Sequence, residues 1–246
     1  LAEKCEKIPN LQVLTLVPPE GAKGKSNALN HGLAVSKGEY IVIYDADNTP
    51  ERRAVMHLAQ EIVQHDDLGA VVGKFRTRNK EVSWLTRFIN IETLSFQWLL
   101  QAGRCRFFGI TTIPETNFII RRSLLEKMGG WNTQALTEDT ELTVRIYESG
   151  YRIYWLPHAV TWEQEPETLR VWIKQRTRWA QGNMWIMGHY FLNIFHLHNS
   201  RIRADVLYFT FTYFVFFLAV VISDAIFVLG LMDITRITIS GPFVVI

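Results

Sequence analysis

Two aspartates, Asp45 and Asp47, end the stretch EYIVIYDAD at residues 39–47 and follow directly on its apolar run from Tyr40 to Tyr44. On an extended chain positions i and i+2 point the same way, so the two carboxylates converge where the strand ends. In open α/β sheets ligands bind at the carboxyl ends of strands, and two adjacent hard oxygen ligands suit Mg²⁺ or Mn²⁺ held together with a diphosphate. The alternative is a solvated turn, in which Asp and Asn are common.

A second acidic group lies in Thr137-Glu138-Asp139. Thr137 is placed to cap the following helix, and acidic residues at a helix N-terminus are stabilised by its dipole. Capping alone would therefore explain the group. The functional alternative is that one carboxylate at the rim of the sheet serves as a general base.

A third group lies in QRTRWAQGNMWIMGHYFLNIF, residues 175–195. Gln175, Arg178 and Trp179 stand at i, i+3 and i+4 on one helical face, and Trp172 joins that face one turn earlier. Arginine is suited to binding phosphate oxygens, and tryptophan offers a flat apolar face to ring-shaped ligands. A core stripe is the competing interpretation, but buried arginine is rare.

Short apolar runs alternate with amphipathic stretches along most of the chain. Strands are predicted at 11–17, 39–47, 68–75, 116–121 and 151–157. Helices are predicted within 23–38, from Thr49-Pro50-Glu51 to about His65, over 84–101 and over 138–149. Strands alternating with helices indicate an α/β fold with a mostly parallel sheet.

Residues 206–223 carry no charge, and as a helix these 18 residues would be about 27 Å long, close to the thickness of the bilayer hydrocarbon. Arg201 and Arg203 flank this segment on its N-terminal side, which predicts that this side is cytoplasmic. Asp224 would lie near the far interface or face a polar interior. A buried core helix is the alternative. The aromatic-rich run from Gly182 to Phe195 is typical of a helix in the membrane interface.

The overall composition excludes several classes of protein. The 246 residues include 26 basic and 24 acidic ones in scattered positions, which argues against a nucleic-acid-binding surface. Cys5 and Cys105 lie far apart, so neither a disulfide framework nor a zinc site is indicated, and a reducing compartment fits. Because the chain begins at Leu1 without a signal peptide and ends in the apolar stretch GPFVVI, we expect an excised fragment.

Taken in order, GKSNALNHG at 24–32, DAD, TED and QRTRW before an apolar segment closely resemble the processive family-2 glycosyltransferases. These are membrane synthases of cellulose, chitin, hyaluronan and poly-N-acetylglucosamine with a GT-A fold. The stretches TEDTELTVRIYESGYRIYWLP, TWEQEPET and KQRTRWAQGNMW are most similar to the bacterial poly-β-1,6-N-acetylglucosamine synthases.

The resemblance implies a role for each matching residue on the donor side. Asp45 and Asp47 would hold the donor diphosphate through Mg²⁺ or Mn²⁺. Gln175 and Arg178 would lie against the donor pyrophosphate. Lys25 would lie near the nucleotide, with a solvated lysine as the alternative.

On the acceptor side, the resemblance implies that Asp139 deprotonates the acceptor hydroxyl and that Trp179 stacks on the acceptor sugar. Residues 107–117, FFGITTIPETN, would lie along the acceptor site. The implied reaction is inverting transfer from a UDP-sugar, with UDP-N-acetylglucosamine the best guess, onto a growing β-linked polysaccharide. It needs a metal and a cation at the departing UDP and a base at the incoming hydroxyl, but no covalent nucleophile.

The resemblance also implies a division of the chain. Residues 1–181 would form a partial catalytic domain, 182–203 an interfacial amphipathic segment and 204–246 a membrane region with one full helix at about 206–232 and the start of another segment. The catalytic domain would be cytoplasmic, in a multi-pass membrane protein with possible accessory synthase subunits.

One family motif has no counterpart in this sequence. The first acidic motif would precede residues 1–10, so we expect an exposed sheet edge and weak UDP binding by this chain alone. Two alternatives stay open: single addition of a sugar to a lipid-linked acceptor, and a catalytically silent assembly subunit.

Overall fold

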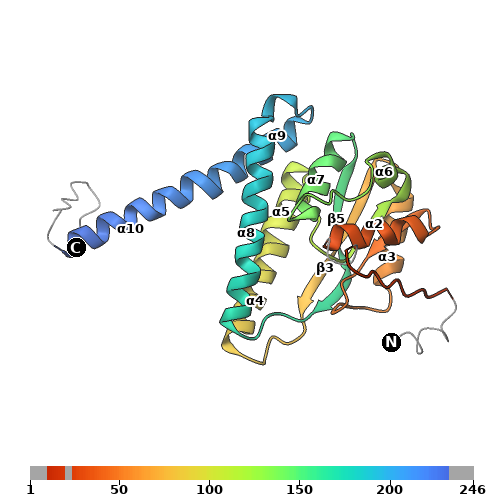
Figure 1. The fold of residues 1–246 in the computed structure, drawn as a ribbon, viewed down its shortest axis with the longest axis horizontal. Coiled ribbons are helices and arrows are strands. Elements are labelled where there is room, and N and C mark those ends of the chain that lie inside the picture. The colour runs from red at the N-terminus through yellow and green to blue at the C-terminus, as the bar shows by residue number, and fades with distance from the viewer. Residues whose placement is uncertain (1–9, 20–23, 233–246) are drawn as a thin grey trace.

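The computed structural model describes residues 10–19 and 24–232. Its centre is a five-stranded sheet in the order β1-β4-β3-β5-β2. The strands are β1 (Tyr40–Ile43), β2 (Thr49–Pro50), β3 (Leu68–Thr77), β4 (Phe118–Arg121) and β5 (Arg152–Glu163). Figure 1 shows this sheet flanked by helices, with one long helix extending away from it.

The sheet is mixed, which corrects the prediction of a mostly parallel one. Within the described residues only β3 and β5 pair in parallel, whereas β4 runs antiparallel to both β1 and β3, and β2 antiparallel to β5. An apolar run identifies a strand buried on both faces but does not reveal its direction. As a result β1, β3 and β5 point the same way, and their carboxyl ends share one edge with the amino end of β4.

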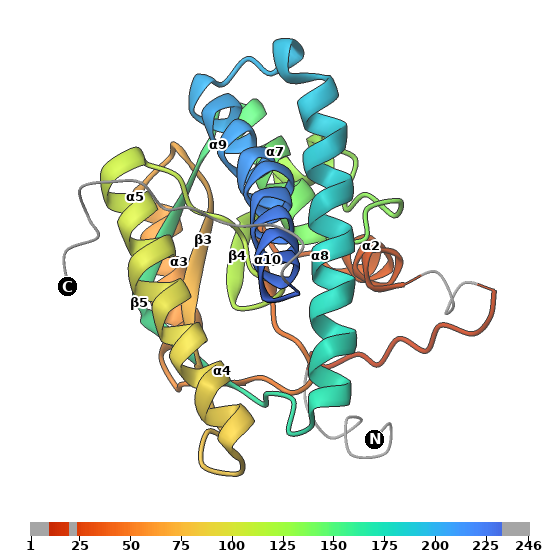
Figure 2. The same cartoon turned by 90° about the vertical axis from the view of Figure 1, so that its left-hand side faces the viewer.

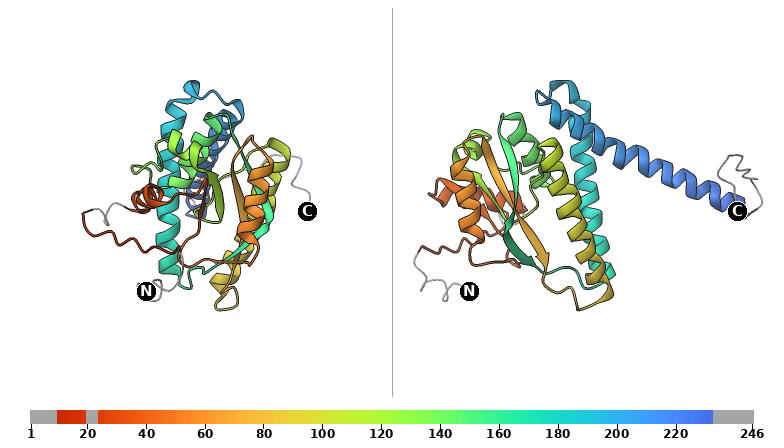
Figure 3. Two further views of the ribbon diagram at one scale, coloured as in Figure 1. Left: turned by 90° about the vertical axis from the view of Figure 1, so that its right-hand side faces the viewer. Right: turned by 180° about the vertical axis from the view of Figure 1, so that it is seen from behind.

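Helices cover both faces of this sheet. They are α2 (Lys25–Val35), α3 (Ala54–Gln64), α4 (Trp84–Ser95), α5 (Ala102–Phe108), α6 (Arg122–Lys127), α7 (Glu138–Glu148) and α8 (Leu169–Leu192). The π-helix η2 (Phe96–Gln101) joins α4 to α5, so the predicted helix at 84–101 continues to Phe108. Figure 3 shows α3 on one side of the sheet, with α2 and α7 on the other.

The core has two parts because alternate residues of a strand face opposite sides. Val71 packs with Leu58 and Ile62 of α3. Ala70 and Val72 join the larger cluster on the other face, which includes side chains of α6 and α7. These two layers hold the strand ends, and therefore the polar residues that follow them, in fixed positions.

Two local predictions are wrong. Residues 11–17 form no strand, and their side chains are mostly exposed. Strand propensity reflects packing in a paired sheet, and within the described residues this run has no partner strand. Thr49-Pro50 does not begin a helix but pairs with Thr161 and Trp162 of β5, so α3 starts only at Ala54.

The C-terminal described segment is a single helix from Ser200 to Leu231, made of α9 (Ser200–Thr210), the π-helix η4 (Phe211–Phe216) and α10 (Phe217–Leu231). It follows a short 3₁₀-helix, η3 (Ile194–His196). Its 32 residues include an apolar stretch of mean hydropathy 2.6 that is not buried inside the protein, so it is long and apolar enough to cross a membrane.

At 1.5 Å per residue the helix is about 48 Å long, more than a hydrocarbon core of about 30 Å requires. Its first turns pack on the rest of the protein through Ile202 and Val206, which are buried. In the view of Figure 2, α4–α5 and α8 stand on either side of α10. Asp224 is exposed on this helix, and the predicted further segment after residue 232 lies outside the described residues.

Candidate functional site

Polar side chains gather at the edge where β1, β3 and β5 end. Asp45 and Asp47 follow β1, as the sequence indicated, and Glu163 ends β5. The reversed β4 brings Glu115 to the same edge, because Asn117 donates its N–H to the Ile43 carbonyl over 2.9 Å. Four carboxylates from three segments of the chain therefore meet at one edge of the sheet.

A first cavity of about 420 Å³ opens beside Lys25, the first residue of α2. Lys25 Nζ lies 2.7 Å from Asp45 Oδ1 and 3.7 Å from Glu138 Oε1. Burial opposes the charge of Lys25, but the surrounding carboxylates outweigh it and raise its pKa. Arg178 and Glu115 also line this cavity. It therefore presents two cations close to Asp45.

A second cavity of about 460 Å³ adjoins the first. Asp45 and Glu115 line both, so the two cavities share a wall. The second extends past Asp47 to the start of the long C-terminal helix. Its polar lining at the sheet edge includes Asp47, Asn48, Asp139, Glu163 and Gln175, and its apolar end includes Phe96, Ile202, Val206 and Phe209.

Asp139 faces this second cavity from the first turn of α7. Its Oδ1 is buried and has no hydrogen-bond partner among the residues that the structure describes. Burial, together with the charges of Glu115 and Glu138, raises the pKa of Asp139 to about 7. A carboxyl group with this pKa exchanges a proton near neutral pH, as a general base must. Thr137 occupies the N-cap position, but its side chain makes no capping hydrogen bond, contrary to the capping interpretation.

The predicted polar face of α8 divides between the two cavities. Arg178 lines the first and lies 3.4 Å from Glu115 Oε1. Trp179 lines the second, and its Nε1 donates to the same Glu115 oxygen over 2.9 Å. Gln175 also lines the second cavity, where its buried Oε1 has no hydrogen-bond partner within residues 10–19 and 24–232. The helix therefore spans the shared wall and does not act on one cavity alone.

Arg176 is a residue that the sequence interpretation missed. Its guanidinium lies 4.2 Å from the centre of the Trp179 ring and 5.9 Å from that of Trp172. It also donates to Glu92 of α4 over 2.7 Å. Arg176 therefore fixes the tryptophans and joins α8 to α4. The sequence contained a signal for this role, because Arg176 lies four residues after Trp172 and three before Trp179, on the same helical face.

Glu115 and Glu163 were missed as well. Burial raises the pKa of Glu115, although Lys25 and Arg178 oppose the shift. Burial and the neighbouring carboxylates Glu165 and Asp47 raise the pKa of Glu163 to about 8, and in the described part of the chain its buried Oε1 has no hydrogen-bond partner. The strand-end reasoning that selected Asp45 applies equally to Glu163. Glu115 precedes a strand, so it could be found only once the direction of β4 was known.

The carboxylates can serve a metal only together with other ligands. Among the described residues no group of three or more His, Cys, Asp or Glu side chains is placed to bind a metal ion. Asp45 and Asp47 nevertheless both line the second cavity. One or two carboxylates completed by phosphate oxygens and water are the usual environment of Mg²⁺. The residues present therefore fit a metal that arrives with a phosphorylated ligand.

Cys105 is a free, partly buried thiol packed against the core, as expected, whereas Cys5 lies outside the described residues.

Of the predicted acceptor loop, Thr112 to Thr116 line the second cavity. Together the two cavities offer cations for an anionic leaving group, acidic groups for a metal and an ionisable carboxyl for a proton.

Comparisons with known proteins agree with this chemistry. Residues 40–244 match the family model of the glycosyl transferase family group 2. The chain is 53% identical over 229 residues to the probable glycosyltransferase YdaM of Bacillus subtilis (strain 168), covering 93% of this chain and 54% of the relative. It is 33% identical over 181 residues to the poly-beta-1,6-N-acetyl-D-glucosamine synthase of Staphylococcus aureus (strain COL), covering 74% and 44%. The chain thus spans about half the length of these relatives.

Two solved structures are similar in fold. The mannosyltransferase PcManGT from Pyrobaculum calidifontis, in complex with GDP-Man and Mn²⁺, is 26% identical with a TM-score of 0.53, covering 68% of this chain and 44% of that one. S. aureus TarS 1-349 is 18% identical with a TM-score of 0.53, covering 84% and 55%, and supports the fold alone.

Proposed function

The chain belongs to the glycosyl transferase family group 2, and from this membership we propose that it transfers a sugar from a UDP-sugar onto a growing β-linked polysaccharide. The predicted enzyme class and GT-A fold are confirmed by the family match and the structural neighbours. UDP-N-acetylglucosamine is the proposed donor, because the sequence is similar to a poly-beta-1,6-N-acetyl-D-glucosamine synthase. Transfer inverts the anomeric centre and repeats on the same polymer.

The observation that carries this proposal is the pair of cavities with a shared wall. The first cavity is lined by Lys25 and Arg178 together with Asp45 and Glu115, and this is where the donor diphosphate binds. The second has acidic groups at one end and apolar side chains at the other, and this is where the acceptor binds. Donor and acceptor then meet at the wall that the two cavities share.

Asp45 and Asp47 would hold Mg²⁺ or Mn²⁺ together with the diphosphate. The bound ion would neutralise charge on the departing nucleotide. A structural neighbour was solved with GDP-Man and Mn²⁺, which supports a divalent ion here. Lys25 and Arg178 provide further positive charge at the leaving group, and preorganised charge of this kind lowers the barrier because it needs no rearrangement during the reaction.

Asp139 accepts the proton of the acceptor hydroxyl. The hydroxyl oxygen forms a bond to the anomeric carbon while the bond from that carbon to the diphosphate oxygen breaks, and its electron pair leaves with UDP. Asp139 lines the second cavity, and its Oδ1 makes no hydrogen bond within the described part of the chain, so the carboxylate can take this proton. Trp179 and Gln175 line the same cavity, where Trp179 stacks on the acceptor sugar and Gln175 binds at the pyrophosphate end.

The Ser200–Leu231 helix, which is long and apolar enough to cross a membrane, supports a membrane location for this reaction. The proposed orientation has the catalytic part on the cytoplasmic side, in a multi-pass protein that works with accessory subunits. The proposed divisions are 1–181, 182–203 and 204–246. The boundary between 181 and 182 falls inside α8, which continues from Leu169 to Leu192, and the boundary between 203 and 204 falls inside the Ser200–Leu231 helix.

The test is UDP release in membranes that contain the protein, with Mg²⁺ or Mn²⁺ and with UDP-N-acetylglucosamine, UDP-glucose or UDP-glucuronate as donor. Metal-dependent turnover of one donor that is lost in Asp139→Asn supports the proposal. Asp67→Asn is the matched control, because Asp67 lies at the opposite end of β3 in an exposed ion pair with Arg152. Sizing of the products distinguishes a polymerase from an enzyme that adds one sugar to a lipid. No turnover of any donor would favour an assembly subunit.

A further inference from the structure

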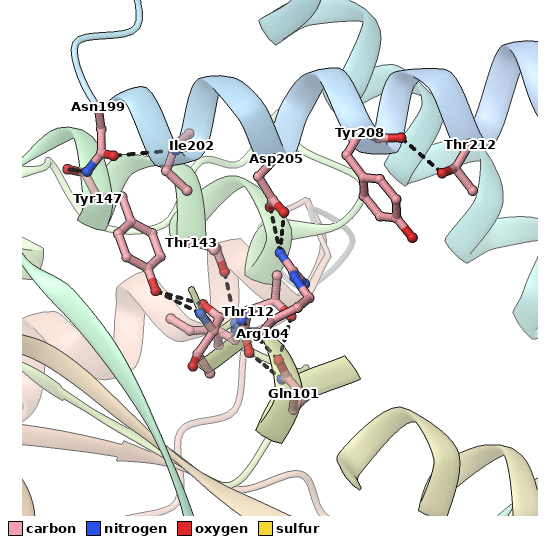
Figure 4. Close-up of polar contacts among 12 residues, drawn as sticks. Gln101, Arg104, Thr112, Thr143, Tyr147, Asn199, Ile202, Asp205, Tyr208 and Thr212 are labelled. Atoms are coloured by element: carbon pink, nitrogen blue, oxygen red, sulfur yellow. Dashed lines mark hydrogen bonds and ion pairs between the residues drawn. The ribbon is translucent and has the colours of Figure 1, made fainter. Parts of the chain in front are cut away.

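A polar contact joins the long C-terminal helix to the catalytic part. Arg104 Nη2 of α5 lies 2.6 Å from both carboxylate oxygens of Asp205 in α9. The two side chains are only 11% and 14% exposed. The guanidinium also lies 5.0 Å from the centre of the Phe209 ring, one turn further along the same helix. Figure 4 shows Arg104 pointing up to Asp205 across the space between the helices.

This ion pair lies in the wall of the second cavity. Arg104, Asp205 and Phe209 line it together with Ile202 and Val206. The helix that is apolar enough to cross a membrane therefore closes the end of the cavity opposite the sheet edge. Its position determines how much room the cavity offers.

A second contact fixes the same helix close to the proposed base. Tyr213 accepts a hydrogen bond from Asn183 Nδ2 of α8 over 3.3 Å. Asn183 Oδ1 accepts one from the hydroxyl of Thr140 over 3.0 Å, and Thr140 follows Asp139 in the sequence. The wall is thus connected both to α5 and to the helix that carries Asp139.

Arg104 is itself held by a framework that reaches the proposed base. The Gln101 side chain, one turn before it, donates to the Thr112 carbonyl over 2.7 Å. The Ile113 N–H donates to Thr143 Oγ1 over 2.9 Å, and Thr143 donates to the Asp139 carbonyl over 2.9 Å. Figure 4 shows Gln101, at the end of η2, bonded to Thr112, with Thr143 of α7 close by. A displacement of Arg104 would therefore reach the loop and the helix that form the site.

A nearly buried ion pair is a weak source of stability, because desolvation of the two charges offsets their attraction. Apolar side chains would hold α9 on α5 at least as firmly. An ion pair instead favours one alignment of the two helices, since a shift along the helix axis would leave both charges unpaired. Its contribution in this wall is therefore orientation.

We propose that Arg104 and Asp205 are positioning residues that fix α9 as the wall of the acceptor cavity. This inference rests on the proposed function. The wall keeps the end of a growing chain close to Asp139 between successive additions. Loss of the pair shortens the products while binding of the UDP-sugar, at the other cavity, is retained.

The test uses three variants. Two are the single substitutions Asp205→Asn and Arg104→Lys, and the third exchanges the two residues by combining Arg104→Asp and Asp205→Arg. The control is Arg87→Gln in the neighbouring α4, which removes an exposed ion pair with Glu81 of the preceding turn. Product length and donor KM are measured in membranes with the UDP-sugar that the wild type uses. Hydrogen exchange of the α5 and α9 amides in detergent measures directly whether the helices separate.

We expect Asp205→Asn to shorten the products about tenfold, a typical coupling for a nearly buried pair, with donor KM within about twofold of wild type. Hydrogen exchange in α5 and α9 should rise in Asp205→Asn. Arg104→Lys and the exchanged double variant should make products longer than those of Asp205→Asn but shorter than those of the wild type. Faster exchange with products of unchanged length would overturn the positioning role. Unchanged hydrogen exchange would show that the pair does not hold α9, which refutes the proposal in full.

A wild type that turns over no UDP-sugar refutes the proposed function and the acceptor role with it, but hydrogen exchange still measures the attachment of the helix.

Discussion

Replacement of Asp139 by asparagine removes a carboxylate that the fold holds at high free energy. The pKa of Asp139 rises from 3.8 to about 7, with burial as the largest cause, followed by the charges of Glu115 and Glu138. At about 1.4 kcal/mol per pKa unit, the ionised form costs the folded state at most about 4 kcal/mol. Asparagine keeps the shape of the side chain without this charge.

The sign of the pH dependence follows from the direction of the shift. Because the folded protein binds this proton more tightly than the unfolded chain, the contribution of Asp139 to stability is fully present below pH 3.8 and is lost as pH rises to about 7. Above that pH, Asp139→Asn should therefore be more stable than the wild type. Turnover should change in the opposite sense, falling by about 10²- to 10⁴-fold because a general base is missing.

In the wild type, the ionised fraction of Asp139 grows from about one-tenth at pH 6 to about nine-tenths at pH 8, so kcat/KM for the donor should rise about tenfold. The assay is UDP release in membranes across this range, beside thermal unfolding in detergent at pH 8. Asp67→Asn serves as the control for both measurements. Undiminished turnover in Asp139→Asn, or a flat wild-type profile between pH 6 and 8, would refute the assignment of the base. A variant that is both inactive and less stable at pH 8 would mean that the carboxylate is structural.

Three further predictions concern other parts of the protein. Arg178→Gln should lower kcat/KM for the UDP-sugar about 10²-fold, because positive charge at the leaving group is lost. Arg176→Gln, which removes the contact with Glu92, should lower kcat/KM less. Steady-state kinetics with varied donor concentration measure both effects. Gly73→Ala should cost about 2–4 kcal/mol, because its Cβ would lie 2.3 Å from the Ala159 carbonyl oxygen. Gly103→Ala, with nothing within 4 Å in α5, should be neutral or stabilise by up to about 1 kcal/mol, and denaturant unfolding compares the two. EDTA should abolish UDP release and added Mn²⁺ or Mg²⁺ should restore it, whereas turnover that resists EDTA would argue against metal binding by Asp45 and Asp47.

Much of the candidate site could be predicted from sequence because its signals are local. Asp45 follows an apolar strand, and Gln175, Arg178 and Trp179 stand at helical spacing, so propensity and periodicity suffice to place them. The uncharged stretch at 206–223 likewise predicted the helix that is long and apolar enough to cross a membrane. Their assigned roles in catalysis and binding stay predictions.

Other features depended on contacts between distant parts of the chain. The run at 11–17 has strand composition but no partner among the described residues, and Thr49-Pro50 pairs with β5 although its composition favours a helix start. In both cases the presence or absence of a neighbouring strand decided the outcome, and local propensity carries no information about neighbours.

The sequence by itself determined which residues could take part in the chemistry, that most of them lie at strand or helix ends, and that an apolar helix follows. The tertiary structure alone decided that β4 runs in reverse, which brings Glu115 to the carboxylates, and that Arg104 meets Asp205 across 101 positions of sequence. It also decided the proton affinity of Asp139, because a pKa depends on burial and on charges brought close in space. Residue type and spacing set what each side chain can do, whereas direction, burial and long-range pairing are properties of the folded chain.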